Sequence, residues 1–576
     1  MQNDLLEFAQ SYDSYKQKFS EKANAYFDSL VKQSAIDTSA NKKSSSEYRK
    51  AVSEVDKLKD KIGGIKTLKI FLIILVVGCF IAAAVLAYLM FRDGQNDSFV
   101  ARLVVAIVCL VAAVVCILVL TLKIKKSLKS LDERKNEKQQ LADKLYSDCM
   151  AQVRPLHNLF GKSVLYKMIE ETLPIVKMDA NFNNARFDIL QNKYGLAENT
   201  NVDESTVGVF SGEVLGNPFV EERRFRMEMG METYTGTKLI TWTERYTDSE
   251  GHSRTRMRSE TLIATVQKPK PFYSTLTRFI YGCEAAPDLS FSHQATFADD
   301  LSENQLKRKV KRESKALQRQ ARKAATTGTG NFTEMANQEF DVLFNAEDRD
   351  NEVQFRLMFT PLAQKNMLYL MKTPEPFGDD FDFIKQKQLN YIVSRHAQNW
   401  QFDEDSSQYM LYDADLCRNA MVGFYETFFR NFYFEVAPVM CIPLYQQHKA
   451  REFIYQTSYK RNYTSFESEV LANALPVNLF AHEQTETDVI LKTSLLQKDK
   501  GIDKLGVAAY SFKTTEHIDY VAQLGGDGHI HDVPVHWLEY IPLEKYSEMQ
   551  LTDDESKISG GVSSARKHGL SAVFIK

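Results

Sequence analysis

The sequence of 576 residues has few cysteines and none of the short motifs that identify common enzyme classes. Its seven cysteines are scattered, with no Cys-x-x-Cys pair and no secreted-type disulfide framework, which indicates a reducing cytoplasm. No phosphate-cradling GxxxxGK[ST], dinucleotide-binding GxGxxG or zinc-binding HExxH segment occurs. From these motifs we assign no cofactor, no metal and no catalytic residue.

The chain also lacks an excess of charge of either sign. It carries 72 lysines and arginines against 75 acids, a net charge of -3, so no global field favours nucleic acid. The contents of hydrophobic (44%) and charged (26%) residues are those of an ordinary folded protein once two apolar stretches are set aside. The length allows about two to four domains.

Those two apolar stretches are Ile70 to Phe91, with 22 residues and no charge, and Leu103 to Leu122, with 20 residues. At a rise of ~1.5 Å per helical residue, each is long enough to cross a hydrocarbon core of about 30 Å. The alternative is a pair of buried helices in a soluble core, but core helices rarely run so long without a polar face. We interpret the pair as a two-span transmembrane α-hairpin.

Basic residues flank the hairpin on both outer sides. Seven lysines and arginines lie between Arg49 and Lys69, and six between Lys123 and Lys135, whereas the connector Arg92 to Ser98 has one base and two acids. Lysine and arginine resist translocation, so we expect the short connector outside and both termini in the cytoplasm.

Helical periodicity surrounds the hairpin. An aromatic seam from Leu5 to Leu30 predicts a helix that docks on another part of the protein, and Ser34 to Ser46 reads as a polar hinge. A second helix, Tyr48 to Ile65, and the pattern from Ile124 to Val153 are expected to pair as an antiparallel stalk; two separate solvated helices are the alternative. Leu156 to Leu173 predicts one more amphipathic helix.

The pattern then changes to alternation. Thr237 to Thr247 and Arg254 to Val266 flank Asp248 to Gly251 and predict a β-hairpin, with Val207 to Val214 and Phe219 to Met229 as further strands of that sheet. Three alternating bases form one face that is either solvated or turned to an acidic partner or lipid: Arg254, Arg256 and Arg258.

The C-terminal half mixes both patterns. Phe340 to Phe344 and Val353 to Phe359 predict strands, and Pro361 to Met371 predicts a helix. Ala420 to Tyr445 contains three charges and two prolines, so we expect a buried helix leading into a strand rather than a third span. The remaining elements expected are a hairpin of Gly506 to Asp519 and Val533 to Ile541 around Gly525 to Gly528, a loose tail at Ser559 to Ser564, and a last short strand at Ala572 to Lys576.

A strongly basic helix is predicted between Glu303 and Lys323. Anionic lipid headgroups are the candidate ligand, because each base near an anionic leaflet contributes ~1 kcal/mol. One alternative is a charged helix that is exposed to solvent or that pairs with the acids of Glu347 to Asp350 and Asp379 to Asp380. Another is a nucleic-acid contact, but the lack of aromatic residues between the bases argues against it. The candidate lipid-contact residues are Lys307, Arg308, Lys309, Lys311, Arg312, Lys315, Arg319, Arg322 and Lys323.

Two groups of side chains have conceivable metal chemistry. Four histidines cluster near the C-terminus, and two of them would share a strand face, but no cysteine or carboxylate pair of known spacing accompanies them. The acids of Gly-Asp-Asp-Phe-Asp are suited to Mg²⁺, but a solvated turn is the interpretation that we favour for them. The residues are His517, His529, His531 and His536, and Asp379, Asp380 and Asp382.

The segments Asn331 to Asp350 and Phe355 to Leu362 together resemble a pattern of uncharacterised bacterial membrane proteins. Those proteins have an N-terminal two-helix hairpin and a cytoplasmic domain of unknown function with a core of Phe, Phe-Asp-Val, an acidic turn and Leu-Thr-Pro. The resemblance covers residues 150 to 400 and implies an architecture without an activity. It implies the cytoplasmic (inner) membrane of a bacterium as the location.

We therefore predict an α+β protein: a transmembrane α-hairpin with a helical stalk, followed by a large cytoplasmic α+β region with antiparallel β-hairpins. The expected function is a membrane-anchored interaction or scaffold protein that binds an unknown protein or itself, not nucleic acid. The alternative is a membrane-tethered enzyme or effector with a C-terminal site that binds metal. The expected segments are N-terminal helices (1–66), the hairpin (67–122), the stalk (123–180), a β-rich domain (181–300), the basic helix with its linker (301–330) and an α+β domain (331–576).

Overall fold

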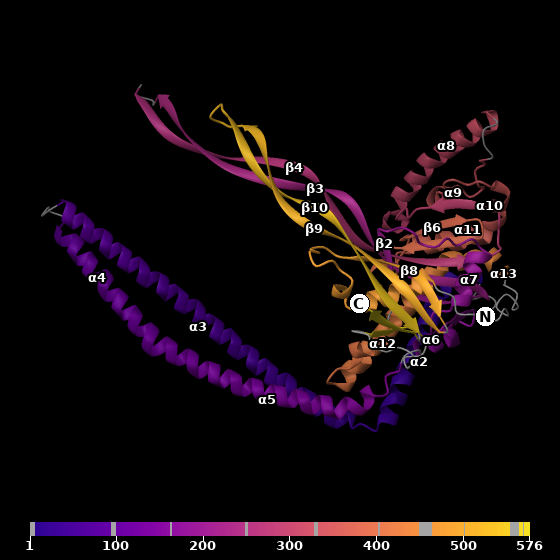
Figure 1. The fold of residues 1–576 in the computed structure, drawn as a ribbon, viewed down its shortest axis with the longest axis horizontal. Coiled ribbons are helices and arrows are strands. Elements are labelled where there is room, and N and C mark those ends of the chain that lie inside the picture. Colours follow the sequence, from indigo (N-terminus) through magenta and orange to yellow (C-terminus); the bar gives the residue numbers. More distant parts are fainter. Residues whose placement is uncertain are drawn as a thin grey trace. The chain divides into compact units, whose positions relative to one another are not determined.

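The fold is described from a computed structural model (Figure 1). It describes residues 6–93, 99–161, 164–247, 252–327, 332–400, 404–448, 464–499, 501–552, 564–567 and 570–575. The chain divides into two compact units. Unit 1 holds residues 1–21, 163–404 and 425–576, and unit 2 holds residues 22–162 and 405–424. The connector residues 94–98, the turn 248–251 and the tail residues 559–563 lie outside the described residues.

Unit 2 is built on two very long helices. The first is α3 (Thr38–Asp93); the second runs through α4 (Phe99–Leu118), the π-helical η2 (Val119–Ile124) and α5 (Lys125–His157) (Figure 1). Their most apolar windows have mean hydropathies of 3.2 and 3.6, and only 6% and 11% of those windows are buried. Both helices are therefore long and apolar enough to cross a membrane.

The two long helices pair antiparallel beyond the apolar windows. Glu54 Oε2 lies 2.8 Å from Lys138 Nζ, the rings of Tyr48 and Tyr146 are 5.5 Å apart, and Gln152 donates to Ser44 at 3.0 Å. In these three contacts the residue numbers decrease along α3 while they increase along α5, which is the register of an antiparallel pair. The predicted stalk pairing is confirmed, and the alternative of two separate helices is wrong.

Two boundaries in unit 2 differ from the prediction. The non-helical hinge is confined to residues 35–37, because α3 already begins at Thr38 and Asp37 caps it by accepting from the Ala40 N–H at 2.9 Å. Leu156 to Leu173 is not one helix, since α5 ends at His157 and α6 covers Val164–Thr172.

Unit 1 contains two antiparallel sheets. The seven-stranded sheet has the order β1-β2-β3-β4-β7-β6-β5, and the five-stranded sheet has the order β11-β12-β10-β9-β8. The strands of the first are β1 (Val176–Met178), β2 (Glu204–Val214), β3 (Asn217–Thr247), β4 (Ser253–Gly282), β5 (Ser290–His293), β6 (Phe381–Gln386) and β7 (Leu389–Ser394). Those of the second are β8 (Ile490–Asp499), β9 (Ile502–Leu524), β10 (Ile530–Thr552), β11 (Ser564–Lys567) and β12 (Leu570–Ile575).

The helices of unit 1 lie around these sheets. They are η1 (Phe8–Ser11), the start of α2 (Tyr12–Ser34), α6, α7 (Asn184–Asn192), η3 (Ala298–Asp300), α8 (Glu303–Thr327), α9 (Gln338–Phe344), α10 (Glu352–Met358), α11 (Pro361–Lys372), η4 (His396–Asn399), residues 425–440 of α12 (Ala414–Met440), α13 (Pro443–Gln447), α14 (Ser465–Ala474) and η7 (Val477–Leu479). Residues 406–409 (η5) belong to unit 2.

Three predicted strand assignments are corrected to helix, and a fourth predicted strand is part of a longer one. Phe340 to Phe344 and Val353 to Phe359 are helical, because the side chains of Asn337 and Asn351 cap α9 and α10 by accepting from backbone N–H groups. Short apolar runs fit either structure, and the caps decide. The segment after α12 is the short helix α13, with Pro443 in its first turn, not a strand. Residues 219–229 are not a separate strand but part of β3.

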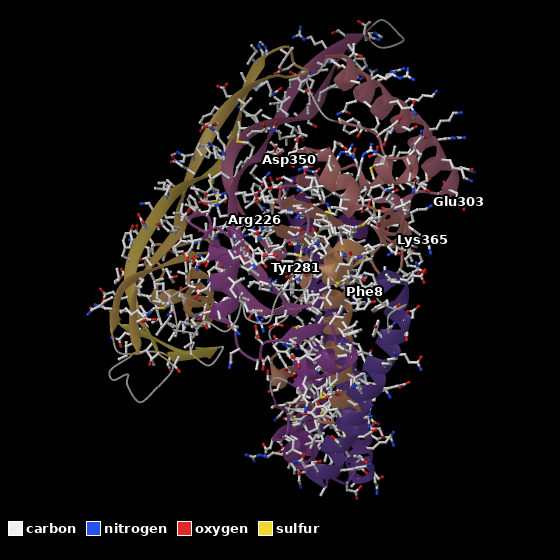
Figure 2. All side chains as sticks on the ribbon, turned by 90° about the vertical axis from the view of Figure 1, so that its right-hand side faces the viewer. Phe8, Arg226, Tyr281, Glu303, Asp350 and Lys365 are labelled. Atoms are coloured by element: carbon white, nitrogen blue, oxygen red, sulfur yellow. The ribbon has the colours of Figure 1, made fainter. Side chains whose placement is uncertain are left out.

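The aromatic seam at the N-terminus docks on α12, as predicted. Phe8 stacks on Tyr433 at 4.3 Å, and Phe19 stacks on Phe429 at 4.4 Å. Phe8 lies inside this layer, whereas Lys365 of α11 is exposed and pairs with Glu7 at 3.0 Å (Figure 2). The N-terminal segment is thus part of the core of unit 1.

Two β-hairpins are much longer than the rest of their sheets. The β3–β4 hairpin lies beside the β9–β10 hairpin (Figure 1), and an apolar cluster that includes Ile240, Leu262 and Val533 fills the space between them. The two backbones approach so closely that a Cβ on Gly236 would lie 2.0 Å from the carbonyl oxygen of Pro534. The two predicted hairpins are confirmed, and they pack against each other. We call residues 229–271 the β3–β4 arm.

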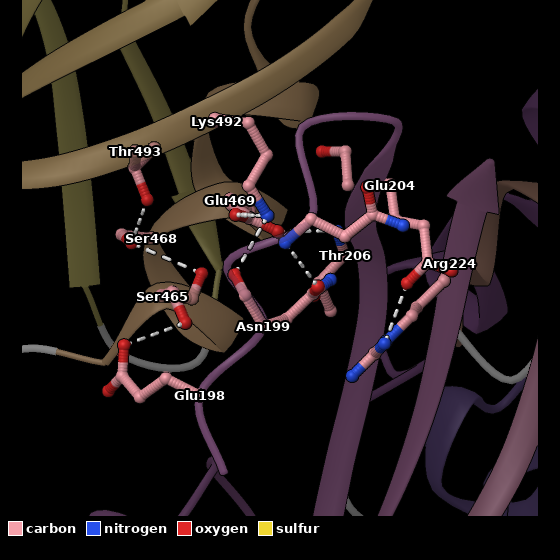
Figure 3. A network of polar contacts seen from close by, with 12 residues as sticks. Glu198, Asn199, Glu204, Thr206, Arg224, Ser465, Ser468, Glu469, Lys492 and Thr493 are labelled. Carbon is pink, nitrogen blue, oxygen red and sulfur yellow. Dashed lines mark hydrogen bonds and ion pairs between the residues drawn. The ribbon is translucent and has the colours of Figure 1, made fainter. Parts of the chain in front are cut away.

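A buried polar junction joins the two sheets through α14 (Figure 3). Glu469 of α14 pairs with Lys492 of β8 at 2.7 Å and accepts from the Thr206 N–H of β2 at 2.7 Å. Burial raises the pKa of Glu469, and Lys492 opposes that rise. Because both carboxylate contacts lie away from water, this junction fixes how α14 sits between β2 and β8.

Candidate functional site

The basic helix α8 presents its charge to solvent. Eight of its nine candidate bases are exposed, and Lys309 is partly exposed. Leu306 and Ser314 are buried on the opposite side, where α8 contacts α9. Two of the bases pair within the helix, Lys307 with Glu303 at 3.4 Å and Arg312 with Glu313 at 2.8 Å.

Three of the acids that could have paired with the bases of α8 have other partners. Asp350 pairs with Lys387 at 3.1 Å, Asp379 accepts from the Thr296 hydroxyl at 2.6 Å, and Asp380 lies 2.6 Å from His396 Nδ1. The bases of α8 therefore form an exposed cationic face. That this face contacts lipid stays a prediction.

We expect a fluorophore on Ala316→Cys, an exposed position of α8, to be quenched by headgroup-labelled lipid when the full chain is held in anionic nanodiscs. The attraction is electrostatic, so quenching should fall as salt rises. Replacing Lys311, Lys315, Arg319 and Arg322 with glutamine should remove most of it. Equal quenching in nanodiscs of neutral lipid would contradict the electrostatic contact.

The outward face of the β3–β4 arm is uncharged from Met231 to Thr243 of β3 and from Met257 to Pro269 of β4. Seven cross-strand pairs cover about 40 Å of this face at ~3.4 Å per residue, and all of their residues are exposed. An ordinary surface, with a quarter to a third of its residues charged, would carry about four charges there. The pairs of this uncharged face are Thr243–Met257, Thr241–Ser259, Leu239–Thr261, Thr237–Ile263, Thr235–Thr265, Thr233–Gln267 and Met231–Pro269.

Among the described residues of the arm, the charges lie on its other face, except that Arg245 follows Thr243 at the end of the uncharged face. Arg256 and Arg258 both donate to Glu244 at 2.7 Å, and Lys268 pairs with Asp519 of β9 at 2.7 Å. The predicted basic face at Arg254, Arg256 and Arg258 therefore alternates with the uncharged face and lies on the side that carries Glu244.

The four C-terminal histidines are not brought together. In the register of the hairpin, His517 is opposite Trp537 and His536 is opposite Ile518. His517 lies 2.8 Å from Glu539, and His531 lies 2.9 Å from Asp527 near the turn that also holds His529. No group of three or more metal-ligating side chains occurs among the described residues.

The carboxylates of the Gly-Asp-Asp-Phe-Asp segment are neither a cation site nor a solvated turn. Besides the contacts of Asp379 and Asp380 given above, Asp382 accepts from the Ala295 N–H at 2.9 Å and pairs with Arg395 at 3.2 Å. These three acids hold the segment before β6 against its neighbours.

A buried acidic cluster lies between the seven-stranded sheet and α12. His396 of η4 has Nε2 3.5 Å from Glu435 Oε1 of α12, and it stacks on Phe377 with centroids 3.8 Å apart. Glu221 of β3 is fully buried, and neither of its carboxylate oxygens has a hydrogen-bond partner among the described residues. Glu222, next along β3, pairs instead with Arg224 at 2.9 Å.

Burial controls the protonation of this cluster. Removal from water raises the pKa of Glu435 to about 7, although His396 opposes the rise. Burial, reinforced by Glu435 and Glu222, raises the pKa of Glu221 well above its usual range. Near neutral pH the pair can hold or release a proton. Phe434, next to Glu435 on α12, lines a cavity of unit 1 whose lining does not include Glu435.

Sequence reasoning missed this cluster because its members come from β3, the segment before β6, η4 and α12, with no local motif. One signal was present. Glu435 stands in the apolar run Phe432 to Ala437, and we used it only to argue against a membrane span. A single acid in such a run predicts a buried carboxyl with a raised pKa.

Comparison with known proteins finds no relative of this chain. The resemblance of residues 331–350 and 355–362 to uncharacterised bacterial membrane proteins stays a prediction. The chain matches no protein family, no curated protein and no solved structure.

Proposed function

We propose that the chain is a membrane-anchored interaction protein in which the two long apolar helices cross the bilayer and the uncharged face of the β3–β4 arm binds another protein. The observation that carries the proposal is the absence of charge over fourteen exposed side chains of that face. The basic flanks of the apolar helices favour keeping unit 1, and the parts of unit 2 outside the apolar helices and their connector, on the cytoplasmic side of a bacterial inner membrane.

A protein surface of low charge is the partner that suits this face. Leu239 is 67% exposed and Ile263 is 60% exposed, and their burial in an interface would be favourable. Lipid headgroups would require bases there, and none is present. Threonine hydroxyls supply hydrogen bonds without the desolvation cost of a charge. The alternative, a tethered enzyme with a metal site, is not supported by any cluster of metal ligands among the described residues.

We expect a photo-crosslinking amino acid at Leu239 or Ile263 to give a discrete crosslinked protein in native membranes. Leu357 of α10, 57% exposed, is the matched control and should give none. Adding Thr241→Lys and Thr261→Lys should lower the yield about tenfold or more, because each unpaired charge weakens a buried contact. A product of twice the chain mass would identify the partner as a second copy.

Crosslinking at Leu239 that equals that at Leu357, or that survives both lysine substitutions, would contradict the proposal.

A further inference from the structure

A cavity of about 350 Å³ opens in unit 1 between the N-terminal segment, α11 and the second half of α12. Three aromatic side chains, Tyr12, Tyr369 and Phe434, line it together with polar and charged residues, and Tyr12 meets Phe434 edge to face at 4.9 Å. This volume lies at the lower end of the range for small-molecule sites, and aromatic walls with a few polar groups are the usual composition.

Arg430 is the polar group in this cavity whose bonding is incomplete. Its Nε is buried and has no hydrogen-bond partner among the described residues. The guanidinium lies over the ring of Phe377 at 5.2 Å, which orients its plane. A buried guanidinium edge without a partner costs free energy, and a carboxylate or phosphate matches its donors in a bidentate pair.

The other charges restrict the class of ligand. Lys16 lies at the rim, with Nζ 5.9 Å from the centre of the Tyr12 ring. Asp13 and Glu375 line the cavity too, and both are exposed, so they leave the inner guanidinium free while repelling molecules with several negative charges. Burial raises the pKa of Tyr12 to about 12, so its hydroxyl remains a neutral donor.

We propose that this cavity binds a small organic anion with one carboxylate or phosphate group, which pairs with Arg430, and an apolar body that lies against Tyr12, Tyr369 and Phe434. The site is independent of the arm and of its partner. Recognition uses the planar fork of arginine for the oxyanion and aromatic contact for the body.

The test uses the full-length protein in detergent and three fluorinated probes followed by ¹⁹F NMR: 4-fluorobenzoate, 4-fluorophenyl phosphate and 4-fluorobenzyl alcohol. We expect saturable binding of at least one of the two anions, and the stronger one identifies carboxylate or phosphate as the group. The neutral alcohol should not saturate. Arg430→Gln should weaken the anion at least tenfold, and Arg430→Lys should recover only part of that loss.

The matched control is Arg418→Gln, on the same helix but away from the cavity, which should leave affinity unchanged. If Arg430→Gln does not fold, Tyr369→Ala serves in its place, because Tyr369 is 40% exposed and its loss removes a wall; affinity should then fall several-fold. Saturable binding by neither anion, or an affinity unchanged by these cavity substitutions, would overturn the proposal.

Discussion

Glu435→Gln is expected to make unit 1 more stable at pH 8 than the unaltered protein, with a much smaller difference at pH 5. The pKa of Glu435 is about 7 in the fold, above the ordinary 4.5. The folded state therefore holds a proton that the unfolded state releases, and the stability that this gives is lost as pH rises from about 4.5 through 7. Glutamine keeps the neutral shape at every pH. The advantage of the variant should grow by about 2 to 3 kcal/mol between pH 5 and pH 8.

The measurement is the unfolding temperature of both proteins across that pH range in one detergent. Glu426→Gln is the matched control, because it removes a carboxyl from the same helix that is only partly buried. A Glu435→Gln difference that is the same at pH 5 and pH 8 would show that burial does not control this group.

Phe19→Ala should cost about 3 to 5 kcal/mol of folding free energy, the usual range for a fully buried phenylalanine. Phe19 is fully buried and stacks on Phe429. Its loss would open a cavity between the N-terminal helix and α12 that neighbouring rings fill only in part. Chemical denaturation of the full chain measures the effect, with the exposed Ser14→Ala as control. A loss below about 1 kcal/mol would mean that this helix is not part of the core.

Long, regular patterns were the ones that predicted structure correctly. The alternation of Thr237 to Thr247 specified the β3–β4 hairpin, because a period of two over many residues has one solution. The aromatic seam specified a docked helix in the same way, because its residues recur every three to four positions over a long segment. What the sequence did not reveal is that β3 continues unbroken from Asn217, since its first six residues are buried on both faces.

Short segments and scattered clusters could not be read in this way. A segment as short as the seven residues of α9, which include Phe340 to Phe344, fits a strand or a helix, and only the Asn337 cap decides between them. The proximity of Glu221, His396 and Glu435 depends on how β3, η4 and α12 meet. The uncharged face of the arm was visible as a run of alternating threonines, but its exposure followed only from the position of the β9–β10 hairpin.

The central claim is that the two apolar helices cross a bilayer and hold the rest of the chain on the side of their basic flanks. Reporters fused after residue 130 and at Lys576, one active only in the cytoplasm and one only in the periplasm, test it directly. We expect both positions to report the cytoplasm, and a reporter in the connector between the helices to report the periplasm. A periplasmic signal at residue 130 or at Lys576 would contradict the account.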